Sequence, residues 1–484
     1  MDGENDGWPV PVGPGTAAAL VRFGVVAPLL ASAATVALAR TARARCPRAG
    51  GWACWMVVLG MAYGLVAAAD AAHCVPPTRL RALRRGVNVA HWLSVDDDGG
   101  GGGERSPPWR RGPAPADLRL LRSAGFDHVR LPVSELLLLE EEEEEEGAGL
   151  AAVAAAVRLA LDAGLAAVVD LHPTPAFKAA VAGDGALAGL GFRRALASAP
   201  VGPLEGVWAR LAAALAGLDP ERVFLEVMNE PTFADPRAWQ AVQGRALAVM
   251  RAAAPRHTLV ASANMRASAA NWDAVDALYE LRPYADCNIV YNLHYYEPFL
   301  FTHQGATWGN SAVTSRVRGL PYPPRLGTMA EVEVADADAE NEPEAFAAAG
   351  AVKAAADYLA SGFDFPDLMD AATEIAAWDH SFAVPVTVNE IGAFEAADLA
   401  SRARYLEAVT RALEGRGLGW TLWALNGGFG LYTDHGDWAG EGPRQLQGEL
   451  LEALVPTPLA RSVRRRVAYG PPGGAERRRS FGSF

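Results

Sequence analysis

Cysteine is scarce in this chain, with four among 484 residues, at positions 46, 54, 74 and 287. No pair has the spacing of a zinc site or of a CxxC redox motif, which argues against both chemistries. Only Cys287 follows Cys74, so a disulfide framework is not what holds the fold. Cys74 and Cys287 either form a bridge or remain two separate thiols, and we expect separate thiols.

The chain also lacks a basic surface. It carries 43 basic and 56 acidic residues, a formal net charge of -13. Seven of the negative charges belong to one run, Glu140 to Glu146, so the remainder is only mildly acidic. Because nucleic-acid binding requires clustered cations, we expect no nucleic-acid partner. The acidic balance is compatible with a neutral polymer as substrate.

Two uncharged apolar segments precede the rest of the chain, Phe23–Ala39 and Ala49–Ala69, of 17 and 21 residues. A membrane-spanning helix needs roughly 20 apolar residues. With the arginines at 40–48 between them, they predict either a two-helix anchor or a secretory signal with Trp55–Val66 as its apolar region. Both place the chain after about Ala72 outside the cytosol, either secreted or attached to a membrane through residues 23–69. The alternative is a soluble extension packed on the main domain.

Composition divides the chain into three parts. Residues 1–79 form the N-terminal extension, 80–460 a single catalytic domain, and 461–484 a basic tail rich in glycine and proline. Within the domain, residues 96–104 and 140–146 are Gly-rich and Glu-rich runs that bury too little surface to offset the entropy of ordering. We interpret both runs as solvated loops.

Short β-branched runs alternate with Ala/Leu-rich runs across the central domain. The expected strands are 86–92, 128–133, 166–172, 223–230, 258–264, 288–296, 384–390 and 420–425. The expected helices include 151–163, 203–216, 237–254, 344–360 and 399–414. Eight strand–helix units predict the α/β class and a (β/α)₈ TIM barrel. A doubly wound open sheet is the alternative, but the glycines at 99–103 lack the GxGxxG spacing typical of its phosphate loop.

Polar residues mark the expected carboxyl ends of six strands, where such barrels carry their active sites. They are Arg130, His172, Asn229 with Glu230, His294 with Tyr296, Glu390 and Trp423. Two glutamates on one rim suggest acid/base chemistry on a glycoside, in which one carboxyl donates a proton while the other stays ionised. A cation such as Arg130 lowers the pKa of a neighbouring carboxylate. Glu226, four residues before Glu230, is interpreted as structural.

Several segments in this order resemble glycoside hydrolase family 5, the cellulase-type endoglycanases. They are RGVNVAHWLS, AGFDHVRLPVS, VVDLHP, FLEVMNEP, NLHYYEPFLFTHQG, TVNEIGAF and GWTLWALNGGFG. The resemblance implies Glu230 as general acid/base and Glu390 as nucleophile.

The same resemblance implies roles for six further residues. Asn229 would bind the sugar 2-hydroxyl, Arg130 would lie close to the nucleophile, and Tyr296 would hydrogen-bond it. His172 and His294 would line the subsite of the ring being cleaved, with Trp423 as its stacking platform. The chain departs from the family at Ala90-His91-Trp92, where members often have Gly-Gly-Trp.

The expected reaction is hydrolysis of a β-linked glucan with net retention, by a monomer, without metal or organic cofactor. The same residues would serve a β-mannanase, a β-1,3-glucanase or a transglycosylase. A metal-dependent barrel hydrolase would need His-x-His on the first strand, which offers only His91. A catalytically silent, membrane-tethered glycan-binding protein is the alternative from a different functional class.

Overall fold

The computed structural model describes residues 74–94, 112–139, 147–183, 202–265, 274–308, 311–335, 342–432 and 446–462. The barrel lies in a compact unit formed by Val75–Trp378 and Pro385–Phe484. The apolar segments 23–39 and 49–69, the loops 96–104 and 140–146 and most of the tail lie outside the described residues. None of the described helices is long and apolar enough to cross a membrane.

The predicted (β/α)₈ barrel is confirmed. Its strands are β1 (Arg85–Asn88), β2 (His128–Val133), β3 (Ala166–Leu171), β4 (Val223–Glu226), β5 (Thr258–Ser262), β6 (Ile289–His294), β9 (Val386–Ile391) and β10 (Gly419–Leu422). They close in the order β1-β10-β9-β6-β5-β4-β3-β2, and every neighbouring pair is parallel. Parallel closure brings all the carboxyl ends to one rim, where side chains distant in sequence meet.

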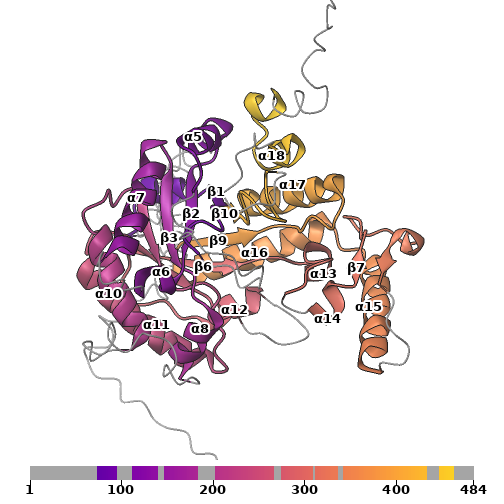
Figure 1. The fold of residues 1–484 in the computed structure, drawn as a ribbon, viewed down its shortest axis with the longest axis horizontal. Coiled ribbons are helices and arrows are strands. Elements are labelled where there is room, and N and C mark those ends of the chain that lie inside the picture. The colour runs from indigo at the N-terminus through magenta and orange to yellow at the C-terminus, as the bar shows by residue number, and fades with distance from the viewer. Residues whose placement is uncertain are drawn as a thin grey trace, which may run out of the picture. The chain divides into compact units, whose positions relative to one another are not determined.

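Helices surround the strands (Figure 1). The main ones are α5 (Pro115–Ala124), α7 (Ala148–Asp162), α8 (Pro175–Ala182), α10 (Pro203–Leu215), α11 (Pro236–Ala253), α12 (Ala274–Glu280), α16 (Phe365–Phe382), α17 (Leu399–Gly415) and α18 (Gly448–Leu454). Several begin at a proline or behind an aspartate cap, as at Asp235 and Asp398, whose side chains accept backbone N–H groups of the first turn. These residues define the position at which each helix begins after its strand.

The connection after β6 is much longer than a simple strand-to-helix link. It contains α13 (Phe299–Thr302), α14 (Ser311–Thr314), the antiparallel pair β7 (Val317–Arg318) and β8 (Glu333–Val334), and α15 (Glu342–Ser361). Helix α15 contacts α13, α14 and both short strands, and these elements gather at one side of the view in Figure 1. The insertion leaves the strand end that carries His294, so it borders the rim.

An apolar cluster fills the barrel interior at the amino-terminal end of the strands. Helix α4 (Pro77–Ala82) precedes β1, and Val75 and Leu83 on either side of it pack against strand residues such as Phe224 and Val290. At the same end of the barrel, a Cβ on Gly86 would collide with the His128 imidazole, which occupies the space that a larger residue would need. The amino-terminal half of the barrel is therefore packed core that includes the buried His128, whereas the predicted site residues lie at the carboxyl-terminal end.

One expectation about the cysteines is wrong. Cys74 and Cys287 are each disulfide-bonded in the structure, rather than two separate thiols. The spacing of the two residues in the sequence, more than two hundred positions, gave no indication of their pairing state. Spatial proximity, which decides whether a bridge forms, is set by the fold and is not visible in residue spacing.

Candidate active site

All eight predicted site residues belong to one network of contacts at the carboxyl-terminal rim. The links join Glu230 to His294, His294 to Glu390, and Glu390 to both Arg130 and Tyr296. Arg130 is joined in turn to Asn229, Asn229 to His172, and His172 to the ring of Trp423. Residues at or just beyond the ends of six strands therefore come together at this rim, and the contacts of each are described below.

Arg130 is the centre of this network. Its side chain is fully buried and donates five hydrogen bonds, to Asn88, Glu226, Asn229 and Glu390. Its Nη2 also lies 2.9 Å from Asp170. Burial alone would lower the pKa of Arg130, but the carboxylates of Asp170, Glu226 and Glu390 outweigh it and raise that pKa well above its ordinary value. The guanidinium is thus a permanent buried cation.

Glu390 is held by hydrogen-bond donors on both oxygens. Oε1 accepts from Nη1 of Arg130 at 2.8 Å, and Oε2 accepts from the Tyr296 hydroxyl at 2.9 Å. Burial and the Glu390 charge raise the pKa of Tyr296 well above its ordinary value, so its hydroxyl remains a donor at neutral pH. These two donors hold the Glu390 carboxylate in place at the rim, with a cation on one oxygen and a hydroxyl on the other.

Glu230 follows the end of β4 in a turn with a left-handed backbone, φ 43°. Its side chain is one-quarter exposed, and Oε1 lies 3.0 Å from Nδ1 of His294. Burial alone would raise the pKa of Glu230, but the hydrogen bond and charge of His294 outweigh it and lower that pKa to about 2. Conversely, burial would lower the pKa of His294, but Glu390 and Glu230 raise it. The pair therefore holds one proton, shared along the Nδ1–Oε1 hydrogen bond.

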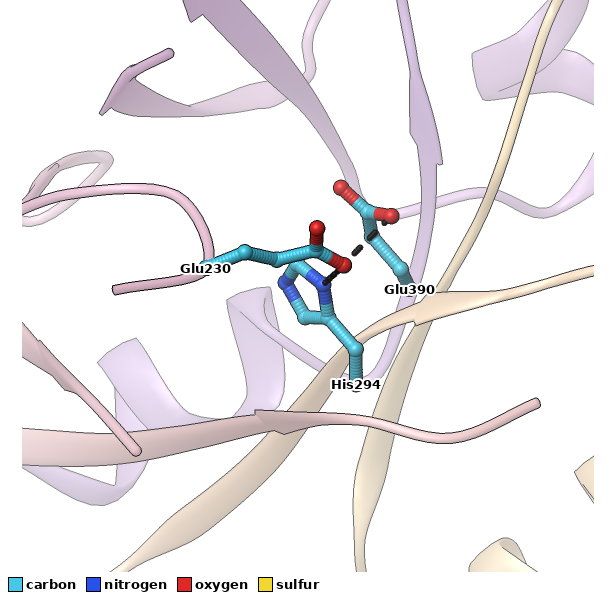
Figure 2. Close-up of side chains that lie close together, drawn as sticks. All are labelled: Glu230, His294 and Glu390. Carbon is cyan, nitrogen blue, oxygen red and sulfur yellow. Dashed lines mark hydrogen bonds and ion pairs between the residues drawn. The ribbon is translucent and has the colours of Figure 1, made fainter. Parts of the chain in front are cut away.

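Figure 2 shows the carboxylates of Glu230 and Glu390 turned toward each other, with the His294 imidazole beside both. One ligand atom from each of these three residues lies within 4.8 Å of the other two. Retaining glycosidases place their carboxyl groups about 5–5.5 Å apart, whereas inverting ones need about 6.5–9.5 Å. The nearest ligand oxygens of the two carboxylates lie within 4.8 Å of each other, which is closer to the retaining spacing than to the inverting one.

The trio is also the only group of this kind that could hold a metal ion among the described residues. However, its single nitrogen lies within hydrogen-bonding distance of Glu230, and the pKa of His294 is raised. A protonated imidazole has no lone pair for a metal at that nitrogen. These three side chains therefore suit a shared proton better than a bound metal ion.

Comparison with known proteins decides the family. The model of cellulase, glycosyl hydrolase family 5, matches residues 102–428, which is more than half of the chain. The chain belongs to glycosyl hydrolase family 5. The resemblance seen in the sequence segments is thereby confirmed, and the family consists of glycosidases, which hydrolyse glycosidic bonds.

Among curated relatives of this family 5 chain, Endoglucanase 3 of Fibrobacter succinogenes is 27% identical over 229 residues, covering 46% of this chain and 32% of the relative. Cellodextrinase A of Ruminococcus flavefaciens is 26% identical over 238 residues, covering 47% and 62%. The chain thus spans less than two thirds of the length of these relatives.

Solved structures show the same fold. The endoglucanase Cel5A of Thermotoga maritima superposes with a TM-score of 0.55 at 23% identity, covering 79% of this chain and 100% of that one. The cellulose synthase subunit Z of Clostridioides difficile gives 0.54 at 21%, covering 77% and 99%. At this identity the likeness shows the barrel fold and nothing finer.

The sequence interpretation missed several polar residues that support the family 5 rim. Asn292 and Asn389 donate to Glu226, and Asn88 donates to backbone carbonyls of β9 and β10. Glu226, predicted to be structural, accepts from Arg130 on both oxygens and is fully buried. Alternation along a strand could have revealed Asn292, which is two residues before His294 and on the same face.

Aromatic side chains from the insertion after β6 adjoin the site of this family 5 protein. Tyr296 contacts the rings of His303 and Phe429, and Phe429 contacts Phe394 and Trp308. Trp308 is 41% exposed, whereas Phe429 is buried. The departure at Ala90-His91-Trp92 leaves His91 with φ 60° and Trp92 buried, so this segment contributes packing.

Loss of the Arg130 cation is expected to destabilise the fold as well as the site. Arg130→Leu leaves the buried carboxylates of Asp170, Glu226 and Glu390 without their counter-ion, which costs about 3–5 kcal/mol in the free energy of unfolding. The matched control is Arg85→Leu, which breaks the partly exposed pair with Glu414 and should cost about 1 kcal/mol or less. Denaturant unfolding measures both, and equal costs would contradict this account of Arg130.

Proposed function

We propose that this chain is a retaining β-glucanase that hydrolyses β-linked glucan through a covalent intermediate on Glu390. The observation that carries the proposal is the pairing of two adjacent carboxylates with different environments. Glu390 faces the Arg130 and Tyr296 donors, whereas Glu230 shares a proton with His294. Glu390 is thus placed to attack as the nucleophile and Glu230 to deliver a proton as the general acid, which are the two roles that a retaining mechanism requires.

In the first step, a Glu390 oxygen forms a bond to the anomeric carbon while the bond from that carbon to the leaving oxygen breaks. The proton that His294 and Glu230 share passes through Glu230 to the leaving oxygen, which takes the electron pair. As Glu390 loses its negative charge to the new bond, it no longer attracts the His294 proton, and that proton passes more readily through Glu230. Nucleophilic attack and proton delivery are thereby coupled.

In the second step, Glu230 removes a proton from water, and the water oxygen attacks the anomeric carbon. The bond to Glu390 breaks, and its electron pair restores the carboxylate, which Arg130 and Tyr296 stabilise again. Trp423, whose ring lies almost parallel to that of His172, offers an apolar face beside these residues. We assign it to contact with the sugar ring being cleaved.

The relatives support a glucan as substrate, because their names describe an endoglucanase and a cellodextrinase. A screen of β-1,4-glucan, β-1,3-glucan, β-mannan and a glycosylated lipid, followed by proton NMR of fresh products, tests both substrate and stereochemistry. We expect β-1,4-glucan to be hydrolysed with the β-anomer formed first. First formation of the α-anomer would exclude retention, and exclusive hydrolysis of mannan would exclude a glucanase.

We further propose that the catalytic domain works outside the cytosol, either secreted or attached to a membrane through residues 23–69. The disulfide state of Cys74 and Cys287 supports this, because disulfides persist in oxidising compartments. Protease protection in intact microsomes tests it, and complete digestion of the domain from the cytosolic side would reject it. We also propose that the protein is a monomer, which a measurement of its molecular mass in solution tests.

The activity is expected to decline at alkaline pH through loss of the proton shared by Glu230 and His294. In a plot of kcat/KM against pH, the decline on the alkaline side should lie above about pH 6.5, the ordinary histidine pKa, because the pKa of His294 is raised. We call this decline the alkaline limb. His294→Gln removes the cation, so Glu230 alone must hold the proton and the limb should move to lower pH. An unchanged limb in that variant would contradict the shared proton, and His380→Gln, an exposed histidine of α16, is the control.

The same shift links stability to pH. A histidine with a raised folded-state pKa stabilises the fold fully below its unfolded pKa, and this stabilisation is lost as pH rises through the folded value. For His294 the loss therefore begins near about pH 6.5 and continues upward. The unfolding midpoint should consequently fall over that window more in the wild type than in His294→Gln.

A further inference from the structure

Asp170 is a fully buried carboxylate of β3 whose surroundings do not satisfy it. Its Oδ2 lies 3.0 Å from Nδ1 of His172 and 2.9 Å from Nη2 of Arg130. Its Oδ1 is buried with no hydrogen-bond partner among the residues that the structure describes. Burial, partly offset by Arg130, raises the pKa of Asp170 to about 6. Burying a carboxylate with an unsatisfied oxygen costs desolvation free energy, so its presence calls for a structural or functional explanation.

The contact with His172 fixes the position of a proton. An ionised carboxylate only accepts hydrogen bonds, so Nδ1 of His172 must carry the hydrogen that faces Asp170. Burial lowers the pKa of His172 to about 3, so the ring carries a single proton at neutral pH. Nε2 of His172 therefore carries a lone pair and no hydrogen, so it can only accept a hydrogen bond.

The next residue in the chain of contacts is Asn229, whose amide has one acceptor and one donor end. Its Nδ2 lies 3.2 Å from Nε2 of His172, and its Oδ1 accepts from Nη2 of Arg130 at 3.0 Å. Both neighbours require the same orientation of the amide. Arg130, Asn229, His172 and Asp170 thus form a closed ring in which every donor meets an acceptor or an opposite charge.

We propose that Asp170 is a positioning residue that selects the Nδ1–H tautomer of His172 and thereby sets the Asn229 amide beside Glu230. The second Nδ2 hydrogen of Asn229 then remains for a substrate hydroxyl. The effect on turnover rests on the function proposed above, but the tautomer does not. Without Asp170, His172 is free to carry its hydrogen on Nε2, which would oppose the donor end of Asn229.

Two substitutions separate this positioning from the charge of Asp170. Asp170→Leu removes the acceptor and should release the His172 tautomer. Asp170→Asn can place its amide oxygen where Oδ2 lies, so it should keep the Nδ1–H tautomer although the charge is lost. Because hydrogen bonds to the sugar 2-hydroxyl strengthen in the transition state, Asp170→Leu should lower kcat about ten- to a hundredfold with little change in KM. Asp170→Asn should retain most of the wild-type kcat.

The test is the ring-nitrogen spectrum of His172 in the full chain, labelled with ¹⁵N-histidine and recorded at about pH 8, above the Asp170 pKa. Long-range ¹H–¹⁵N correlations distinguish Nδ1–H from Nε2–H, and His172→Gln identifies the signals. We expect Nδ1–H in the wild type and in Asp170→Asn, and a mixture or Nε2–H in Asp170→Leu. An Nε2–H tautomer in the wild type, or the same pure Nδ1–H tautomer in Asp170→Leu, would overturn the proposal.

The design also distinguishes failures. If Asp170→Leu does not fold, the wild type and Asp170→Asn still decide, because an Nε2–H tautomer in either contradicts the ring. If the wild type hydrolyses no β-glucan, the proposed function fails while the tautomer result stands. If the tautomers agree but Asp170→Leu retains full kcat, Asp170 orders the ring without positioning anything for the reaction, and the proposal is overturned.

Discussion

Glu390→Gln is expected to abolish hydrolysis of an aryl β-glycoside, lowering kcat by at least roughly a thousandfold. The amide has nearly the shape of the carboxylate but no charge with which to attack the anomeric carbon. Its NH₂ group would also face a donor, either Arg130 or Tyr296, since both oxygens of Glu390 accept hydrogen bonds. Steady-state kinetics with 4-nitrophenyl β-glycosides of glucose oligomers measures the loss.

The control for this substitution is Glu414→Gln. Glu414 is also a carboxylate paired with an arginine, but it lies in α17, and its partner Arg85 begins β1, at the opposite end of the strand from the site. It should retain the wild-type kcat. Wild-type turnover in Glu390→Gln, with a matching circular dichroism spectrum, would remove Glu390 as the nucleophile.

Glu230→Ala is expected to lower kcat/KM on natural glucan about a hundred- to ten-thousandfold, because the leaving oxygen then departs without a proton. A substrate with a dinitrophenyl leaving group does not need that proton, so its glycosyl-enzyme should still form and accumulate. Azide, an anion that needs no general base, should then release the sugar and restore turnover. Absence of rescue in a folded variant would argue against Glu230 as the acid/base.

The configuration of the azide product assigns the two carboxylates independently. In Glu230→Ala, azide attacks the glycosyl-enzyme on Glu390, and the product should be the β-glycosyl azide. In Glu390→Ala, azide occupies the place of the missing nucleophile, and the product should be the α-glycosyl azide. If the two variants gave the opposite products, the roles proposed for Glu230 and Glu390 would be exchanged. Proton NMR of the isolated azides reads the anomer directly.

Much of the fold and site could be predicted from sequence because both follow from strand ends. All eight barrel strands were expected, since buried parallel strands appear as continuous β-branched runs. Their ends were less exact: the strand expected at 223–230 stops at Glu226, and Glu230 lies in a turn beyond it. The apolar residues Val227 and Met228 continue past Glu226, and the backbone N–H groups of Val227 and Asn229 still donate to β5 and β3, so composition gave no sign of where the strand ends.

What could not be predicted depends on contacts between distant segments. The β7–β8 pair and α16 were not expected, and two-residue strands are too short to show a periodic pattern. The hydrogen-bond ring through Asp170 joins residues from three strands, and only spatial proximity reveals that its donors and acceptors match. In the sequence, Asn88 appeared only as part of the segment RGVNVAHWLS, although its side chain donates hydrogen bonds to the backbone of two other strands.

The segment Arg85-Gly86-Val87-Asn88 illustrates how a family signature combines unrelated constraints. Gly86 leaves the space filled by the His128 imidazole, whose Nε2 lies 2.9 Å from the hydroxyl of Thr421. Asn88, two residues later, accepts from Arg130 and belongs to the rim. A barrel that had lost both glutamates would still need room for its imidazole and would still match at this glycine. Such a match diagnoses descent and architecture, and only the carboxylates diagnose the reaction.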